Sequence, residues 1–447
     1  MAGLPRLVTD VAETRRHLTR KRGFSEPSLS PRAKDGIRRV FGTDLSADEV
    51  VARILRDVRD EGDAAVMRYA AAFDGAAPAQ LEVPKAEWEK AARAIDPRLL
   101  EAMHVAAQRI RAFHQRQVRT SWLEWDELGA LGQVVRPLER VGIYTPGGTA
   151  VYPSSLLMTA IPARVAGVDE IVVCSPAGTD GELSPLILAA AHVAGVDRVF
   201  RIGGVQAIAA MAYGTSTVPH VDKIYGPGNI FVVLAKQQVY GMVAIDQLPG
   251  PTETLVVADD SADPTLVAAD LIAQAEHDPM ASAILLTTSR SLAETVLQEI
   301  PTQLATLDRS EIASESLAAN GMIAVVPDVA TAISLANAYA PEHLCLLLRD
   351  PWGAIGLVKH AGGIFLGEDS PEALGDYTSG PSHVMPTGGT ARFFSPINVA
   401  EFTKVISVAA ANRRAIEELG PATIALARAE GLTGHARAIE LRLERGD

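Results

Sequence analysis

Four short segments in the second half of the chain combine side chains that can bind a metal with side chains that can move protons. They read Gln274-Ala-Glu-His277, Pro341-Glu342-His343, the run from Gly375 to His383, and Glu430-Gly-Leu-Thr-Gly-His435. Imidazole, carboxylate and amide groups are nitrogen and oxygen donors of the kind that suits zinc. A carboxylate beside an imidazole is also suited to general acid–base catalysis. The residue types therefore point to metal binding and proton transfer in one protein.

Gln274 and His277 lie at the end of a predicted helix. Asp263 can cap this helix, and Pro264 suits its first turn. Gln274 closes the apolar stripe of the helix, His277 follows three residues later on the same face, and Pro279 ends the helix. Two donors at this spacing can share one metal ion. The alternative is a polar helix end whose side chains hydrogen-bond to nearby carbonyl groups.

Glu342 and His343 follow a helix that Pro341 stops, and they precede a predicted strand. At such a junction both side chains can enter one cleft, as a base and a group that orients water. The alternative is a surface glutamate beside a core histidine. The helix that carries Gln274 ends, and the strand after Glu342 and His343 begins, at the same edge of a parallel sheet, where its strands start. We therefore expect this pair and Gln274 to meet. Ligands of open α/β sheets normally bind at the opposite edge.

The remaining candidates lie further along the chain. The segment 375–383 is too rich in Gly, Ser and Pro for a regular element, and loops of this kind commonly carry sites. Asp376 in this segment is a metal ligand or, as the alternative, the first residue of an Asx turn. His435 lies on or near a C-terminal helix, where a single histidine is more often structural than a ligand.

Composition limits the class of protein. The chain has 447 residues, which corresponds to roughly 2–4 domains. Its 48% apolar and 21% charged residues are typical of a soluble globular protein, and its net charge of −13 argues against nucleic acid or an anionic membrane as a partner. Cys174 and Cys345 are its only cysteines, and no apolar run is long enough to span a membrane. We therefore expect a cytoplasmic protein without disulfides.

Two series of β-rich segments alternate with helical stretches. The first comprises 141–144, 170–174, 198–202 and 223–225, and the second 254–257, 283–287, 322–326, 343–348 and 363–366. This alternation indicates βαβ units and mainly parallel sheets. The tetrapeptide Ala-Gly-Val-Asp occurs at 166–169 and at 194–197, each time as a turn in which glycine ends a helix. We predict an α/β protein with two doubly wound, incomplete Rossmann-like domains, a small N-terminal arm and a tail domain that is mostly helical after Ile397.

Two glycine-rich segments follow strands of the first series. Residues 144–149 read Tyr-Thr-Pro-Gly-Gly-Thr and precede a helical stretch, which suits an anion at a helix N-terminus. Residues 226–229 read Gly-Pro-Gly-Asn at another strand exit. Neither contains the G-x-G-x-x-G fingerprint, so these segments by themselves give only a weak indication of a dinucleotide.

Taken together, these motifs resemble the histidinol dehydrogenase family from about residue 38 to the C-terminus. The ordered set that carries the resemblance is Tyr-x-Pro-Gly-Gly, Gly-Gly-x-Gln-Ala-Ile-Ala (203–209), Gly-Pro-Gly-Asn, Gln-Ala-Glu-His, Pro-Glu-His, Gly-Asp-Tyr-x-Ser-Gly-x-x-His-Val-x-Pro-Thr and Glu-Gly-Leu-Thr-x-His. The resemblance implies an enzyme of histidine biosynthesis that oxidises L-histidinol to L-histidine through L-histidinal. It also implies one Zn²⁺ per subunit and the reduction of two NAD⁺.

The resemblance implies a role for each residue that matches a family motif. The implied zinc ligands are Gln274, His277, Asp376 and His435. The implied catalytic pair is Glu342 and His343, and the implied NAD contacts are Tyr144, Gln206 and Asn229. Substrate contacts are implied for Thr252, His383 and Glu430, together with His343 and the four zinc ligands. Two positions depart from the common pattern, since Thr252 stands where Ser is usual and Ser382 replaces the Asn before His383.

The resemblance also implies a homodimer in which His435 completes the partner's site. We expect residues 1–40 to form the arm, 41–143 and 258–397 the metal-binding catalytic domain, 144–257 the NAD-binding domain, and 398–447 the tail domain. Three alternatives stay open. They are a related zinc- and NAD-dependent dehydrogenase of another polyol, a zinc aldolase or lyase without NAD, and a non-catalytic metal-binding scaffold that would leave Glu342 and His343 without a role.

Cys345 raises an alternative for the aldehyde step. It lies two residues after His343, on the same face if the strand begins there, and a thiol near a base can form a thiohemiacetal. The surrounding leucines would raise its pKa and leave the thiol inert. We therefore expect Cys345 to be a core residue and the aldehyde to react as its hydrate.

Overall fold

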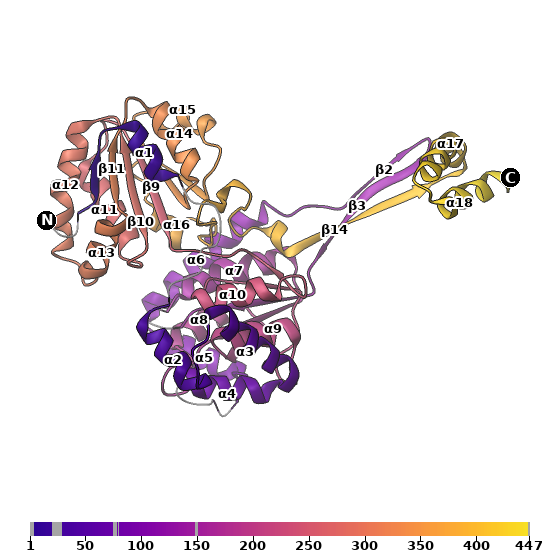
Figure 1. Ribbon diagram of the computed structural model, residues 1–447, viewed down its shortest axis with the longest axis horizontal. Helices are drawn as coiled ribbons and strands as arrows, with labels where there is room; N and C mark the ends of the chain where they lie inside the picture. Colours follow the sequence, from indigo (N-terminus) through magenta and orange to yellow (C-terminus); the bar gives the residue numbers. More distant parts are fainter. Residues whose placement is uncertain (1–3, 20–28, 75–77, 79, 148–150, 446–447) are drawn as a thin grey trace.

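The computed structural model describes residues 4–19, 29–74, 78, 80–147 and 151–445. The end of the glycine-rich segment 144–149 and part of the N-terminal arm lie outside these residues. The described chain forms two α/β units and a projecting arm (Figure 1).

One unit is built on a six-stranded parallel sheet. Its strands, in spatial order, are β1 (Arg6–Val8), β11 (Met322–Val325), β10 (Ser282–Thr287), β9 (Glu253–Ala258), β12 (His343–Leu347) and β13 (Gly363–Leu366). The helices that pack on its faces are α11 (Pro264–Ala275), α12 (Arg290–Leu304) and α13 (Ser310–Asn320) on one side, and α1 (Val11–Leu18) and α14 (Val329–Tyr339) on the other. Successive residues of each strand enter two different cores, so the strand sequences are almost continuously apolar.

The other unit is built on a five-stranded parallel sheet. Its strands are β6 (Arg198–Arg201), β5 (Glu170–Ser175), β4 (Arg140–Tyr144), β7 (Lys223–Tyr225) and β8 (Ala244–Ile245). The helices of one face are α5 (Lys85–Ala94), α6 (Pro97–Gln115), α7 (Pro153–Ala166) and α8 (Pro185–Ala194). Those of the other are α2 (Pro31–Phe41), α3 (Ala47–Glu61), α4 (Asp63–Asp74), α9 (Gly204–Tyr213) and α10 (Ile230–Val239).

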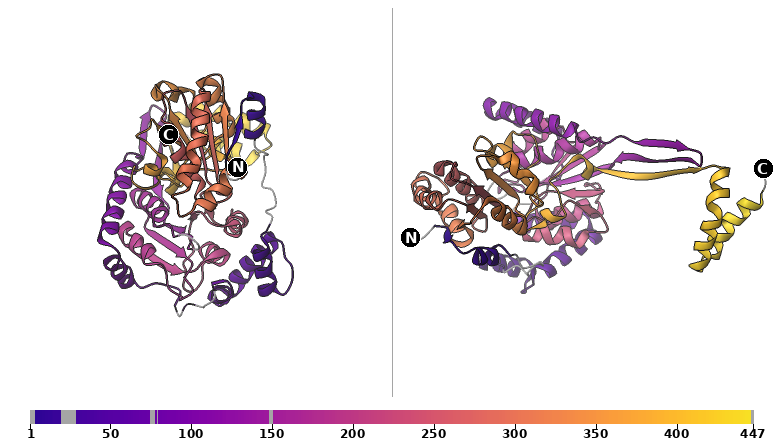
Figure 2. Two further views of the ribbon diagram at one scale, coloured as in Figure 1. Left: turned by 90° about the vertical axis from the view of Figure 1, so that its left-hand side faces the viewer. Right: turned by 90° about the horizontal axis from the view of Figure 1, so that it is seen from above.

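An arm projects from the two units, and both Figure 1 and Figure 2 show it reaching well beyond them. It consists of the antiparallel sheet β2 (Trp122–Asp126), β3 (Gly129–Pro137) and β14 (Thr403–Ala411), followed by α17 (Arg413–Ala429) and α18 (Thr433–Glu444). Large apolar side chains of the arm are exposed, among them Trp125, Leu131 and Leu426. Within the described residues, no helix is long and apolar enough to cross a membrane.

The predicted α/β class with parallel sheets is confirmed, and each of the nine predicted strands is present within about one residue at either end. Both Ala-Gly-Val-Asp turns are confirmed as well. Gly167 ends α7 and Gly195 ends α8, each in the left-handed conformation, with φ of +89° and +70°. A side chain at either position would be strained.

The structure differs from the sequence-based expectation in three places. Residues 6–8 of the expected N-terminal arm form an edge strand of the six-stranded sheet. The expected tail domain begins with the long strand β14 before its helices. Helices α3 to α6 lie in the region assigned to the metal-binding domain, but they pack on the five-stranded sheet. The reason is the same in each case. The strand or sheet against which each segment packs lies elsewhere in the chain, and a local sequence pattern does not predict that contact.

Candidate active site

Glu342 and His343 lie at the amino end of β12, beside the amino end of β9. Helix α14 ends at Tyr339, and Ala340 takes a left-handed conformation before Pro341. One oxygen of Glu342, Oε2, accepts hydrogen bonds from the Thr252 hydroxyl at 2.6 Å and from the Glu253 backbone N–H at 3.0 Å. The hydroxyl that Thr252 shares with the more usual serine is therefore used to hold Glu342.

The His343 imidazole is buried and anchored through one of its two nitrogens. Its Nδ1 lies 3.2 Å from the Glu253 carbonyl oxygen and 3.9 Å from Glu342 Oε2. Its Nε2 lies 3.6 Å from Asp376 Oδ1 and has no hydrogen-bond partner among the described residues. Buried polar atoms are nearly always paired, so Nε2 is the atom that this site offers to a bound molecule.

The charges around the pair shift both pKa values. Burial raises the pKa of Glu342 to about 7, although the adjacent His343 acts in the opposite direction. Burial alone would lower the pKa of His343, but the carboxylates of Glu342 and Asp376 outweigh burial and raise it to about 10. The two side chains therefore form a coupled acid–base pair that is shielded from bulk water.

Gln274 and His277 approach this pair from the end of α11. Asp263 caps the helix by accepting a hydrogen bond from the Thr265 N–H at 2.8 Å, and Pro264 occupies its first turn, as predicted. The helix ends at Ala275, earlier than predicted, so His277 follows the helix instead of lying on it. Beyond His277 the chain turns, and the Asp278 carboxylate accepts a hydrogen bond from the Met280 N–H.

His277 nevertheless belongs to the site. The Arg309 guanidinium donates to the His277 carbonyl oxygen at 3.2 Å and fixes the backbone after the helix. Burial lowers the pKa of His277, while the nearby Asp376 carboxylate acts to raise it. The lowered pKa favours the neutral imidazole, which is the form that binds metals.

The Gln274 side chain is buried among Thr252, Glu253 and Glu372. Its NH₂ group donates to Glu372 Oε1 at 2.9 Å, and its oxygen accepts from the Glu253 N–H at 3.0 Å and lies beside the Thr252 hydroxyl, whose proton is donated to Glu342. The opposite orientation of the amide would set acceptor against acceptor. Glu372, whose pKa burial raises to about 7, was missed by the sequence analysis. Its position one helical turn before Asp376 was the available signal.

Asp376 and His383 are joined by a hydrogen bond. Asp376 lies in the short helix α16 (Glu372–Tyr377), so the expectation of a wholly irregular segment was wrong. Its carbonyl oxygen lies 2.7 Å from His383 Nδ1, and the other ring nitrogen of His383 lies 3.0 Å from the Ser155 hydroxyl of α7. His383 therefore bridges the two α/β units. Ser382 is buried before it and accepts a hydrogen bond from the Val384 N–H.

Glu430 and His435 do not reach the other candidate residues within one chain. Both are exposed near the end of the arm, Glu430 at the end of α17 and His435 in α18 (Figure 1). In the described part of the chain, no group of three or more His, Cys, Asp or Glu side chains is arranged to hold a metal by itself. The structure thus brings Gln274, His277 and Asp376 to Glu342 and His343 and leaves His435 apart.

Cys345 is buried in β12, in the core between that strand and α11. Its Sγ lies 3.9 Å from Glu372 Oε2, and burial raises the pKa of the thiol well above its usual range. A thiol in this environment is a poor nucleophile.

Tyr144, Gln206 and Asn229 line one cavity of about 540 Å³ at the carboxyl edge of the five-stranded sheet. The Tyr144 hydroxyl accepts a hydrogen bond from the Gly204 N–H at 3.1 Å, and Asn229 caps α10 through its side-chain oxygen. The other lining residues include Gly147, Tyr152, Pro176 and Phe231. This is the edge at which α/β sheets normally bind ligands.

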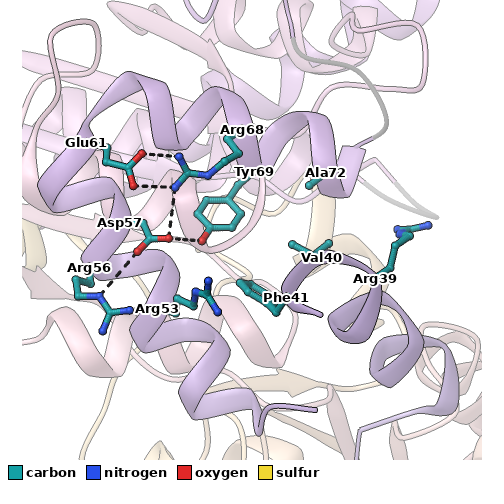
Figure 3. Close-up of a pocket in the computed structure, with 10 residues that line it drawn as sticks. All are labelled: Arg39, Val40, Phe41, Arg53, Arg56, Asp57, Glu61, Arg68, Tyr69 and Ala72. Atoms are coloured by element: carbon teal, nitrogen blue, oxygen red, sulfur yellow. Dashed lines mark hydrogen bonds and ion pairs between the residues drawn. The ribbon is translucent and has the colours of Figure 1, made fainter. Parts of the chain in front are cut away.

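A larger cavity of about 780 Å³ lies between α2, α3 and α4 (Figure 3). It contains none of the predicted site residues. Two of its four arginines pair with acids of α3, since Arg68 donates to Glu61 and to Asp57 and Arg56 pairs with Asp57, while Tyr69 also donates to Asp57. We therefore place the candidate active site between the two sheets and not here.

Comparison with known proteins gives a consistent result. A family model described as histidinol dehydrogenase matches residues 38–443. Histidinol dehydrogenase from Deinococcus radiodurans is 53% identical over 435 residues, covering 97% of this chain and 99% of that protein. The same enzyme from Thermus thermophilus is 52% identical over 405 residues, covering 91% and 97%. The crystal structure of histidinol dehydrogenase from Elizabethkingia anophelis matches with a TM-score of 0.90 and 34% identity, covering 99% of both chains.

Proposed function

The chain belongs to the histidinol dehydrogenase family, as an oxidoreductase that oxidises histidinol in histidine biosynthesis, and we propose that it works with one zinc ion per subunit and two NAD⁺. The product of the first oxidation is L-histidinal and that of the second is L-histidine. The observation that carries the proposal is the buried Glu342–His343 pair beside a set of zinc-type donors, in a chain whose other sheet carries a cavity of about 540 Å³.

The donors near His343 fit a zinc ion. Gln274, His277 and Asp376 supply an amide, a buried imidazole whose pKa is lowered, and a carboxylate, and His343 Nε2 beside them lacks a partner among the described residues. Bound there, zinc would orient the imidazole and amine nitrogens of histidinol and stabilise negative charge on the reacting oxygen. A cation on Asp376 would also withdraw that carboxylate from His343 and lower the imidazole pKa.

His343 is the proposed base for the alcohol. Its Nδ1 stays on the Glu253 carbonyl oxygen, which holds the ring while Nε2 faces the substrate. Bound NAD⁺ would accept the hydride of the carbinol carbon, and Nε2 is placed to take the hydroxyl proton. The burial of the ring keeps this transfer away from bulk water.

Glu342 is the proposed base for the aldehyde step. One carboxylate oxygen is held by Thr252 and Glu253, which leaves the other oxygen to accept a proton from water. The activated water would add to the carbonyl carbon of L-histidinal, and a second bound NAD⁺ would accept the hydride of the hydrate. His383 and Glu430 are proposed substrate contacts, with His383 oriented by Ser155 and by the Asp376 carbonyl oxygen.

Tyr144, Gln206 and Asn229 are the proposed NAD⁺ contacts. They line a single cavity between the N-termini of α9 and α10, where backbone N–H groups favour a pyrophosphate. The hydrogen bond between Ser155 and His383 links the unit that carries this cavity to the unit that carries Glu342 and His343.

We further propose a homodimer in which His435 of the partner subunit completes each zinc site. The support for this proposal is the arm, which carries Glu430 and His435 away from their own subunit and exposes Trp125, Leu131 and Leu426. Exposed apolar surface of this kind is typical of a subunit interface.

We also propose a cytoplasmic location. Cys174 and Cys345 are both free thiols, which suits a reducing compartment.

The experiment that tests the function is NADH formation from L-histidinol by the purified protein, with and without a strong chelator. We expect two NADH for each histidinol, loss of activity with the chelator, and recovery when zinc is restored. NADH formation that is insensitive to complete removal of the metal would refute the zinc proposal, and failure to oxidise histidinol at all would refute the function.

A further inference from the structure

We propose that a buried ion pair between Lys236 and Asp246 positions the loop 226–229 for NAD⁺ and ties that loop to the catalytic edge of the other sheet. The inference rests on the proposed binding of NAD⁺ in the cavity lined by Tyr144 and Asn229. Neither charged residue lines that cavity, so both act through their neighbours.

The pair is the most deeply buried ion pair of the described structure. The Lys236 side chain is 0% exposed and that of Asp246 4%. The Lys236 ammonium group donates to Asp246 Oδ1 and, at 2.9 Å, to the Gly226 carbonyl oxygen. Burying two charges is costly unless every group is paired, and this arrangement satisfies that condition.

Both backbone groups of Gly226 are held by this pair. Asp246 Oδ2 accepts the Gly226 N–H at 2.8 Å, while Lys236 holds the carbonyl oxygen of the same residue. Gly226 has φ of +112°, and a Cβ there would collide with the Tyr144 carbonyl oxygen. The pair therefore clamps the start of the loop against Tyr144, and the loop ends at Asn229, which caps α10.

The same pair begins a connection to the other α/β unit. Asp246 Oδ1 accepts the Gln247 N–H at 2.6 Å, and the Gln247 amide donates to the Met385 carbonyl oxygen at 2.9 Å. Three residues on, the Gly250 N–H donates to the Thr387 hydroxyl at 2.6 Å. The segment 247–250 is followed closely by Thr252, which donates a hydrogen bond to Glu342.

The geometry gives each half of the pair a specific consequence. Without Lys236, Asp246 keeps a buried charge without its counter-ion, and the Gly226 carbonyl oxygen loses its donor. Without the Asp246 charge, as in an asparagine, only one acceptor oxygen remains, so either the Gly226 N–H or the Lys236 and Gln247 donors face an NH₂ group. In both cases the loop that carries Asn229 is no longer preorganised. Part of the binding free energy of NAD⁺ is then used to order the loop. Affinity for NAD⁺ should fall more than affinity for histidinol.

The test uses the zinc-loaded, full-length enzyme and three variants. Asp246→Asn keeps the shape of the side chain and removes its charge, and Lys236→Met removes the ammonium group. Lys223→Met is the matched control, because Lys223 is also a largely buried lysine that pairs with a carboxylate, Glu401. It lies in β7, three residues before Gly226, but its second contact is the Glu401 carbonyl oxygen at the base of the arm.

The measurements are the Kd of NAD⁺ by calorimetric titration, the KM of each substrate, kcat, and the melting temperature. We expect Asp246→Asn and Lys236→Met to raise the Kd and KM of NAD⁺ at least about ten-fold, with the KM of histidinol within about two-fold of the parent. The control should lower the melting temperature while leaving the Kd of NAD⁺ unchanged.

A parent-like Kd for NAD⁺ in folded Asp246→Asn would overturn the inference, as would an equal rise in the control. Asp246→Asn decides the matter even if Lys236→Met does not fold, because its side chain fills the same volume. If the parent enzyme itself does not bind NAD⁺, the proposed function fails instead, so the two failures can be told apart.

Discussion

The two sheets of this molecule use opposite edges for their proposed ligands. The five-stranded sheet presents its carboxyl edge, where Tyr144 ends β4 and Asn229 follows β7. The six-stranded sheet presents its amino edge, where His343 begins β12. Carboxyl edges are the usual ligand sites of such sheets, so the second arrangement needs a physical reason.

Helix polarity supplies this reason. At the carboxyl edge, the N-termini of α9 and α10 face the cavity, and their partial positive charge suits the pyrophosphate of NAD⁺. At the amino edge, the C-termini of α11 and α14 approach the site, and their partial negative charge suits zinc and the ammonium group of histidinol. The charge of each proposed ligand therefore matches the edge proposed for it, and the hydrogen bond between Ser155 and His383 links the two edges.

The largest effect is expected from removing a metal donor at the amino edge. His277→Ala or Asp376→Ala should weaken zinc binding by about 100-fold or more and nearly abolish oxidation of histidinol, because one protein ligand and its supporting contacts are lost. NAD⁺ affinity should be retained, since the cavity lies on the other sheet. The measurements are zinc content by atomic spectroscopy and NAD⁺ titration, and stoichiometric zinc in both variants would refute the ligand assignment.

The next effect separates the two oxidations within the amino edge. With L-histidinal supplied directly, Glu342→Gln should reduce turnover about 10²–10⁴-fold, because hydration loses its base. Cys345→Ala should retain both oxidations, with a modest loss of stability, because the thiol is buried and inert. The opposite result, in which Cys345→Ala abolishes the aldehyde step and Glu342→Gln spares it, would make the thiol the nucleophile.

A third prediction concerns the projecting arm, whose residues Glu430 and His435 lie away from both sheet edges of their own subunit. His435→Ala and His343→Ala subunits, each inactive alone, should recover about a quarter of the parent activity after they are mixed, dissociated and reassociated. Half of the dimers would then be mixed, and one of the two sites in each would carry no defect. If mixed dimers form, as verified by mass, and activity does not return, His435 serves the site of its own subunit.

The smallest effect is expected at the carboxyl edge. Asn229→Ala should raise the KM of NAD⁺ about ten-fold and, as a lost helix cap, lower the stability by about 1 kcal/mol. Asn229→Asp is the control, because it keeps the capping oxygen. Steady-state kinetics and thermal unfolding measure both effects, and a larger change in the KM of histidinol than in that of NAD⁺ would break the proposed division between the edges.

The sequence by itself determined the local structure of this protein. Alternating β-rich and helical segments gave the nine predicted strands, Asp263 and Pro264 gave the start of α11, and Pro341 gave the end of α14. These features follow from propensities and caps that act over a few residues, so the sequence carries them directly. The ordered motifs, which extend from residue 144 to residue 435, were sufficient for the family.

Tertiary structure decided which distant elements meet. Residues 403–411 look like part of a helical tail until they pair with β3, more than 250 residues earlier in the chain. Glu372 carries no visible role until it lies against the Gln274 amide. Lys236 and Asp246 are ordinary charges until folding removes them from water and places Gly226 between them. Such pairings depend on the burial and topology of the whole chain, which no local pattern encodes. They place His343 at the amino edge of one sheet and Asn229 at the carboxyl edge of the other.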